Sequence, residues 1–303
     1  MPNSDCLLSP THVAYADETS YNVGRYRGLC VVSTQKKYEK ELDQALRRIL
    51  CDSNISEFKW EKLRTAKTRF GALAMLNFTV RKACEGIIRV DSLTWDTEDR
   101  RHQIPGRDDI ANMQRMYYHL FRNVMCVRWP DGSSWCLYPD ENTALEWQTV
   151  ADYLEAISIG VDIDENLFTG GTFKIRLKEE FKINEIMPCL SHTNPLAQLA
   201  DLFAGLGVYS RSCYDKFESW MRTKSSQVTL FEGWVNEVLK GISSADQERC
   251  RVLAEFDAEC KRYRLGVSLR SNRGLRTFDP KKPINFWWYA PQHEKDRAPT
   301  RRS

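Results

Sequence analysis

The stretch HVAYADETS, residues 12–20, decides the fold because it has the pattern of a short β-strand that ends in two adjacent acids. The apolar residues before the acids suit a buried strand, whereas Asp17 and Glu18 are poor strand residues and costly to bury. The next apolar run, LCVVST at 29–34, follows a Gly-containing segment that favours a turn. The two runs therefore predict a hairpin with the acidic pair near its open end.

Further along the chain, strand-like apolar runs alternate with amphipathic helical patterns. This alternation predicts an α/β domain with a mixed β-sheet flanked by helices. After residue 212 the patterns are helical, so we expect an α/β domain at 1–212 and a helical extension with a basic aromatic tail at 213–303 that packs on it. The other expected strands are 57–60, 86–95, 133–142 and 172–183, and the expected helices are 36–50, 61–84, 109–127, 143–157, 194–210, 227–240 and 244–262, the last with a capping box of Ser244 and Gln247.

The composition is that of an ordinary globular chain, with 42% hydrophobic and 28% charged residues. No run approaches a transmembrane helix, and the start MPNSDCLLSP lacks the pattern of a secretory signal. Ten cysteines are scattered without a Cys-x-x-Cys pair or zinc-like spacing, so we expect buried reduced thiols instead of disulfides or a zinc site. These features predict a cytoplasmic protein with no membrane partner.

Three further places put a carboxylate where a core element is expected to end or face inward. Glu57 and Lys59 share one face of the expected strand EFKW because they are two residues apart. Asp140 closes the strand WCLYPDEN. In the helix NPLAQLADLFAG, Gln198 and Asp201 are three residues apart and share one face, and the small residues of this helix permit close packing on a sheet.

Carboxylates that converge without a cation repel one another, and one or more of them then binds a proton. A hard divalent ion removes this conflict, because Mg²⁺ and Mn²⁺ prefer carboxylate and water oxygens as ligands. Two such ions held by shared acids support in-line attack on a phosphodiester. We therefore expect Asp17 to belong to a metal site, with Lys59 steadying a phosphate or the nucleophilic water. Taken singly, each acid also has a simpler interpretation as a turn former, a cap or a solvated charge.

The combination of YADETS, EFKW, VDSL, YPDEN and SHTNPLAQLADLFAG resembles the DUF3800 family (domain of unknown function 3800) over about residues 11–210. Members of that family look like ribonuclease-H-type folds, and the helix motif is the most specific part of the resemblance. The resemblance implies a nuclease that depends on Mg²⁺ or Mn²⁺. It implies an acidic site of Asp17, Glu57, Asp140 and Asp201, supported by Glu18, Lys59, Gln198 and the strand residue Asp91.

From residue 261 onward the chain carries twelve Lys or Arg against three acids, although the net charge of the whole chain is only +3. Such a basic tail favours contact with a polyanion such as DNA or RNA. The run NFWWYA follows Lys281 and Lys282, and aromatics among bases suit stacking on unpaired nucleic acid, which makes Trp287 and Trp288 candidate contacts. The competing interpretation, which we favour, is that the aromatics anchor the tail on the core.

Three functions are consistent with these features. The leading one is hydrolysis of a nucleic-acid phosphodiester by two divalent ions. The second is a non-catalytic ribonuclease-H-like protein that binds nucleic acid, or binds a protein partner through its C-terminal region. The third, a glycoside hydrolase with a carboxylate pair, fits less well because such a pair needs no divalent ion. The chain has neither a Gly-x-Ser-x-Gly elbow nor a phosphate-binding Gly-rich loop, which argues against serine-hydrolase and ATP-dependent schemes.

Overall fold

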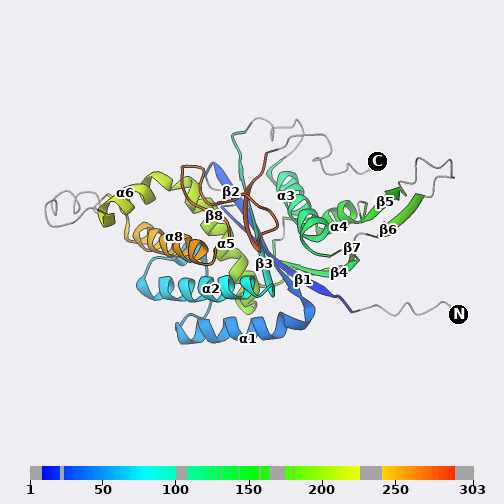
Figure 1. Cartoon of the computed structure of the whole chain (residues 1–303), viewed down its shortest axis with the longest axis horizontal. Coiled ribbons are helices and arrows are strands. Elements are labelled where there is room, and N and C mark those ends of the chain that lie inside the picture. Colours follow the sequence, from blue (N-terminus) through cyan, green and yellow to red (C-terminus); the bar gives the residue numbers. More distant parts are fainter. Residues whose placement is uncertain are drawn as a thin grey trace.

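The computed structural model is built around a six-stranded β-sheet with helices on both of its faces (Figure 1). In order across the sheet, the strands are β10 (Ile284–Trp288), β3 (Ile88–Asp96), β2 (Tyr26–Gln35), β1 (His12–Thr19), β4 (Ser133–Pro139) and β7 (Phe181–Ile186). Two further strand pairs form small separate sheets, namely β5 (Ile159–Ile163) with β6 (Ile175–Glu179) and β8 (Val267–Ser268) with β9 (Arg276–Thr277). The structure describes residues 9–20, 24–99, 108–130, 132–142, 144–156, 158–163, 175–179, 181–225 and 241–290.

One strand gives the sheet its mixed character. β2 runs antiparallel to its neighbours β1 and β3, whereas the pairs β1–β4, β4–β7 and β3–β10 are parallel. This order and polarity match a ribonuclease-H-like arrangement, so the α/β fold class predicted from the sequence is confirmed. Because β1, β3 and β4 run in the same direction, their carboxyl ends meet along one edge of the sheet.

The helices form two layers, one on each face of the sheet (Figure 1). Val13 and Tyr15 point to one face and Ala14 and Ala16 to the other, because strand side chains alternate. The first face, which we call the α5 face, carries α1 (Lys36–Asp52), α2 (Ala66–Cys84), α5 (Pro195–Ser212), α6 (Tyr214–Ser225) and α8 (Ser244–Arg262). The second, the α3 face, carries α3 (Asp109–Asn123), a π-helix (Val124–Arg128) and α4 (Trp147–Glu155).

α5 lies directly on β1, β2 and β3, and its residues from Pro195 to Ser210 are all buried. Small residues on both sides permit this close approach. A Cβ on Gly28 of β2 would meet Val208 at 2.6 Å, and a Cβ on Gly207 would meet the Ser92 hydroxyl at 2.9 Å. The expectation that the small residues of this helix serve close packing on a sheet is therefore confirmed.

Two expected strands are wrong. The segment EFKW is a loop that leads into a 3₁₀ helix at Trp60–Lys62, because the N–H groups of Phe58 and Trp60 bond to side chains of α5 instead of a neighbouring strand. The run at 172–183 is not one strand either. Its described residues belong to β6 and β7, which lie in different sheets.

Two helices start later than expected, and the cap of a third differs. α2 begins after Thr65, whose side chain caps it, and α4 begins at Trp147. Ser243 caps α8, so the expected capping box of Ser244 and Gln247 is wrong by one position. The helix expected at 227–240 lies outside the described residues.

The C-terminal region is continuous with the main core. β10 pairs in parallel with β3 and completes one edge of the sheet, while α6 and α8 extend the layer on the α5 face. The expected boundary at 212/213 therefore falls between two helices of one layer and does not separate two cores. Within the described ranges, no helix has the length and apolar character needed to span a membrane, and the cysteines there are free thiols.

Candidate functional site

Three aspartates from distant parts of the chain meet at the carboxyl end of β1. Asp17 lies on the α5 face, opposite Cys30 of β2. Asp201 comes from the second turn of α5, and Asp140 follows β4, where its N–H donates to the Ala16 carbonyl at 2.7 Å. Burial, and after it the charges of Asp201 and Asp140, raise the pKa of Asp17. The three carboxylates predicted from the sequence therefore lie close enough to interact.

Two polar side chains of α5 hold the loop 57–60 along that helix. Gln198 Oε1 accepts a hydrogen bond from the Phe58 N–H at 2.8 Å. Asp201 Oδ2 accepts one from the Trp60 N–H at 2.6 Å. Because Lys59 lies between the two bonded amides, the Gln-x-x-Asp pair fixes the position of Lys59 beside the acids.

Gly205 is the residue of α5 that allows this loop to approach. A Cβ there would meet ring atoms of Trp60 at 2.1 to 2.5 Å. We expect Gly205→Ala to displace Trp60 and the neighbouring Lys59, and to lower the free energy of unfolding by about 1–3 kcal/mol, as overpacking does in other cores. Thermal denaturation measures this loss. The double variant Gly205→Ala/Trp60→Leu is the control, since the smaller side chain at position 60 should restore part of the stability. No recovery of stability would mean that the clash with the Trp60 ring is not the cause of the loss.

Ser191, which sequence analysis missed, connects three members of the site. Its N–H donates to Asp140 Oδ1 at 3.1 Å, and its Oγ accepts from Lys59 Nζ at 2.8 Å. Its carbonyl accepts from Gln198 Nε2 at 2.8 Å. Ser191 is buried in the 3₁₀ turn that precedes α5. The motif SHTNP marks this turn in the sequence, but nothing local indicates that its serine reaches three partners.

Lys59 is the cation at the centre of the site. Its Nζ lies 3.8 Å from Asp140 Oδ2 and 4.0 Å from Glu57 Oε1. Burial opposes the charge of Lys59, but the surrounding carboxylates, Asp17 first among them, outweigh burial and raise its pKa. Glu57 also pairs with Lys62 at 3.3 Å, so Glu57 is joined to the site through the lysines. Lys59 is therefore charged and compensates part of the negative charge of the acids.

Asp17 is the least compensated of the acids. Its side chain is 4% exposed, and its Oδ2 atom has no hydrogen-bond partner among the described residues. Burial also raises the pKa of Asp201 to about 7, although the Trp60 N–H and the charge of Lys59 favour its ionised form. A buried carboxylate in this state takes up either a proton or a cation.

Glu18 faces away from the three aspartates. It follows Asp17 in the strand and therefore points to the α3 face, where Tyr117 Oη donates to its Oε2 and Asn142 Nδ2 donates to its Oε1 at 2.6 Å. Burial raises the pKa of Glu18, although these two bonds favour its charged form. Because Asn142 lies two residues after Asp140, Glu18 holds the loop that carries Asp140 and is a positioning residue.

Asp91 is not part of the acidic site, contrary to the expectation. It lies opposite Val31 on the α3 face and is 1% exposed. Arg89 Nε donates to it at 2.8 Å, Asn285 Nδ2 donates at 3.1 Å, and Arg128 lies 3.6 Å away. Asp91 is therefore a buried ion-pair partner that ties β3 to β10 and to the π-helix.

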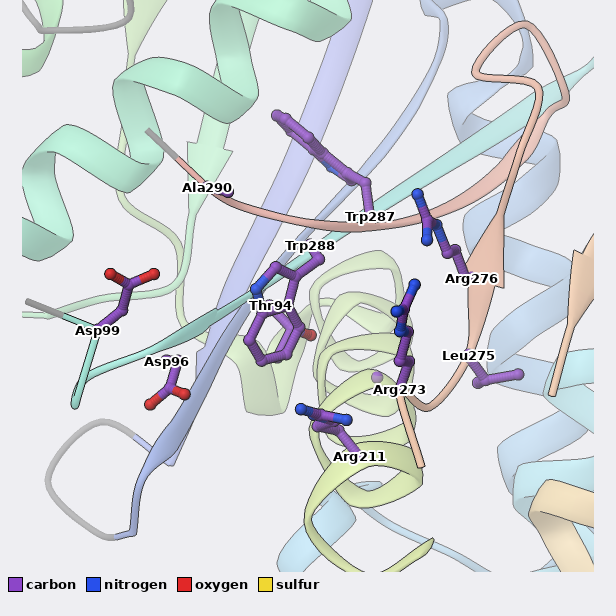
Figure 2. Close-up of a pocket in the computed structure, with 11 residues that line it drawn as sticks. Thr94, Asp96, Asp99, Arg211, Arg273, Leu275, Arg276, Trp287, Trp288 and Ala290 are labelled. Carbon is purple, nitrogen blue, oxygen red and sulfur yellow. The ribbon is translucent and has the colours of Figure 1, made fainter. Parts of the chain in front are cut away.

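The residues expected to contact nucleic acid are dispersed. Lys281 is exposed, and Lys282 Nζ donates to the Arg264 carbonyl at 3.4 Å. Figure 2 shows Trp287 and Trp288 on opposite sides of β10. Both tryptophans are half-buried, and Trp287 packs with the cluster on the α3 face.

The acids suit a hard divalent cation in their chemistry but are not arranged around one. Throughout the described part of the chain, no group of three or more His, Cys, Asp or Glu is placed to hold a metal ion. All the donors are carboxylate oxygens, which Mg²⁺ and Mn²⁺ prefer. The unpartnered Oδ2 atom of Asp17 is the atom that a cation would satisfy, and Asp140 and Asp201 would be the other ligands.

No protein-family model matches the chain. It is 38% identical over 295 residues to "Uncharacterized protein ORF2'" of Methanothermobacter thermautotrophicus, and the match covers 95% of this chain and 97% of that protein. The chain belongs to the family of this protein. "Uncharacterized protein ORF2" of the same organism is 37% identical over 294 residues, with the same two coverages. Since these matches span nearly the whole chain, the similarity to the ORF2 proteins is not confined to residues 1–212.

Proposed function

We propose that this protein is a metal-dependent nuclease that hydrolyses nucleic-acid phosphodiester bonds, and that it is related to the ribonuclease-H-like DUF3800 proteins. One observation carries the proposal. Asp17, Asp140 and Asp201 meet at the carboxyl edge of a mixed sheet, and a buried oxygen of Asp17 has no hydrogen-bond partner among the described residues. Burying such a carboxylate costs free energy of folding. Binding of divalent ions for phosphodiester hydrolysis would explain why the protein has a carboxylate there.

In this proposal Asp17, Asp140 and Asp201, which the structure does not arrange as a metal cluster, would hold Mg²⁺ or Mn²⁺. The ion would supply Lewis-acid stabilisation and a more acidic bound water. Lys59 would contact a phosphate oxygen, and its charged ammonium group among the acids supports this role. Gln198 and Ser191 keep Lys59 in place through the hydrogen bonds described above. Glu57, whose Oε1 atom lies 4.0 Å from Lys59 Nζ, would orient the attacking water.

The expected partner of the proposed nuclease is DNA or RNA in the cytoplasm. The sequence from residue 261 onward supplies the positive charge for such a partner. A protein partner that binds through the C-terminal region belongs to the second candidate function.

The second candidate function is nucleic-acid binding without hydrolysis. One observation favours it: Lys59 Nζ already lies within 4.0 Å of Asp140 and Glu57, so these acids have a counter-charge without any metal. A non-catalytic protein of this kind would bind nucleic acid equally well in chelator and in Mn²⁺, and no strand would be cut.

Incubation with a substrate panel distinguishes the two functions. The panel contains single-stranded DNA, double-stranded DNA, RNA and the RNA–DNA hybrid, each with Mg²⁺, with Mn²⁺ and with chelator. We expect cutting of at least one substrate with a divalent ion and none in chelator. Intact substrates that are nevertheless bound in every condition would support the second function and contradict the first.

A further inference from the structure

A second site lies on the same face of the sheet as the acids, where β3, β10 and the end of α5 meet (Figure 2). It is a pocket of about 390 Å³, and Arg211, Arg273, Arg276 and Trp288 are among its lining residues. We call it the arginine pocket. In Figure 2 the three arginines lie on one side of Trp288, whereas Asp96 lies on the other. The arginines come from α5 and from the segment before β10, so the pocket exists only in the folded chain.

The arginine pocket has an excess of positive charge. No carboxylate of a described residue forms an ion pair with Arg211, Arg273 or Arg276. Asp96 and Asp99 also line the pocket, so its three arginines leave an excess of one positive charge over these two acids. Asp96 does not neutralise the arginines, because Arg25 donates to both of its carboxylate oxygens at 2.7 to 3.0 Å. These hydrogen bonds from Arg25 lower the pKa of Asp96. The pocket therefore suits an anion.

Arg211 is held in place before any ligand arrives. Its guanidinium lies 5.2 Å from the ring centre of Tyr26 and 5.0 Å from that of Trp288. One of its terminal nitrogens donates to the Asn272 carbonyl, while its buried Nε has no partner in the described part of the chain. Arg273 and Arg276 are exposed and sit at the rim. A fixed guanidinium beside two exposed ones and an indole ring is a surface that suits a phosphate and an adjacent base.

The distance between the arginine pocket and the acids fits a single strand. Across the sheet, Trp288 of β10 pairs with Thr94 of β3. Thr94 pairs with Gly28 of β2, and Gly28 pairs with Thr19 of β1. Three strand spacings therefore separate Trp288 from β1, or about 14 Å. Along α5, the ten residues from Asp201 to Arg211 span about 15 Å. The rise of about 3.4 Å for each nucleotide applies to a strand stacked in a duplex, and an extended single strand spans more, so this distance corresponds to at most about four nucleotides.

We propose that the arginine pocket binds one nucleotide of a single-stranded nucleic acid, at most about four positions from the phosphate that faces Asp17. The arginines contact its phosphate, and Trp288 offers a stacking surface to its base, which must be unpaired to reach the ring. This inference rests on the proposed function for the position of the cut phosphate. It replaces Lys281, Lys282 and Trp287 as the expected contacts, and keeps Trp288.

Fluorescence anisotropy with a labelled 12-nucleotide single strand tests this proposal. The measurements use chelator, so binding is separated from cutting. We expect the double variant Arg273→Ala/Arg276→Ala to weaken binding at least tenfold and to reduce the salt dependence of log Kd by about one to two. The matched control is Lys281→Ala/Lys282→Ala, which removes the same charge from the neighbouring segment outside the pocket and should change Kd less than threefold.

Three results would overturn the proposal. One is equal weakening of binding by both double variants, which would indicate nonspecific attraction to positive charge instead of binding in the pocket. Another is equal binding of an abasic strand of the same length, which would exclude base stacking. The third is equally tight binding of a polyglutamate peptide, which would indicate an acidic protein partner. Because binding is measured without metal, the result can be interpreted even if the protein proves to have no nuclease activity. Conversely, a pocket that does not bind the strand would say nothing against the proposed metal site.

Discussion

Asp17→Asn is expected to reduce cleavage of the best substrate by at least about 10³-fold in Mg²⁺ or Mn²⁺, because the acids lose the ligand whose oxygen has no other partner. The substitution keeps the size of the side chain and removes its charge. Asp17 forms no ion pair within 4.0 Å among the described residues, so the variant should remain folded. Single-turnover cleavage, measured well below the melting temperature of each protein, gives the rate ratio.

Asp91→Asn is the matched control for this variant. Asp91 is also a buried aspartate of the same sheet, but it lies on the α3 face between Arg89 and Arg128. Its loss should destabilise the protein by about 3–5 kcal/mol, because it leaves buried guanidinium groups without their partner, and the remaining folded protein should still cut. Equal rates for the wild type and Asp17→Asn would show that Asp17 is not a ligand.

The second large effect concerns stability without metal. Asp17→Asn should be about as stable as the wild type near pH 4 and more stable at pH 8, by about 1–3 kcal/mol. The reason is that burial raises the pKa of Asp17, so the folded wild type must ionise a buried carboxyl as the pH rises. A carboxyl group whose pKa is higher in the folded than in the unfolded protein stabilises the fold below its unfolded-state pKa. This stabilisation is lost as the pH rises through its folded-state pKa. Asp201, with a pKa of about 7, follows the same rule.

Thermal denaturation of both proteins in chelator from pH 4 to pH 8 measures this difference. The comparison has to be made between the two proteins, because burial lowers the pKa of His12, whose titration changes stability in the opposite sense below pH 6.5. At pH 8 the variant should melt several degrees higher than the wild type. A variant that is less stable than the wild type at pH 8 would mean that the Asp17 carboxylate stabilises the fold, which contradicts our account.

The sequence predicts the central part of the fold well, because β1, β2, β3, β4 and α5 have strong local patterns. The loop at 57–60 could not be recognised, since its backbone is held by Gln198 and Asp201, which lie about 140 residues further along the chain. The strand β10 was also missed. Its pairing with β3 depends on contacts such as Asn285 with Asp91, 194 residues apart, which no local pattern encodes.

The site shows the same limit. Asp17, Asp140, Asp201 and Lys59 are brought together as predicted, because each follows or faces an element whose position was clear from its pattern. Asp91 was included in error, since an acid in a strand motif points to either face and only the register of β3 with β2 decides which one. The arginine pocket was missed because its residues come from separate segments whose charges look ordinary in the sequence.

The most direct test of the acidic site is calorimetric titration of the metal-free protein with Mn²⁺ at pH 7.5, in two buffers of different ionisation enthalpy. We expect the wild type to bind Mn²⁺ and to release protons, because burial raises the pKa of Asp17, whose proton must leave when a cation binds. Asp201, with a pKa raised to about 7, is mostly ionised at this pH and adds a smaller share. Asp17→Asn should bind at least tenfold more weakly. Binding by both proteins with the same affinity, or no binding by the folded wild type, would contradict the account.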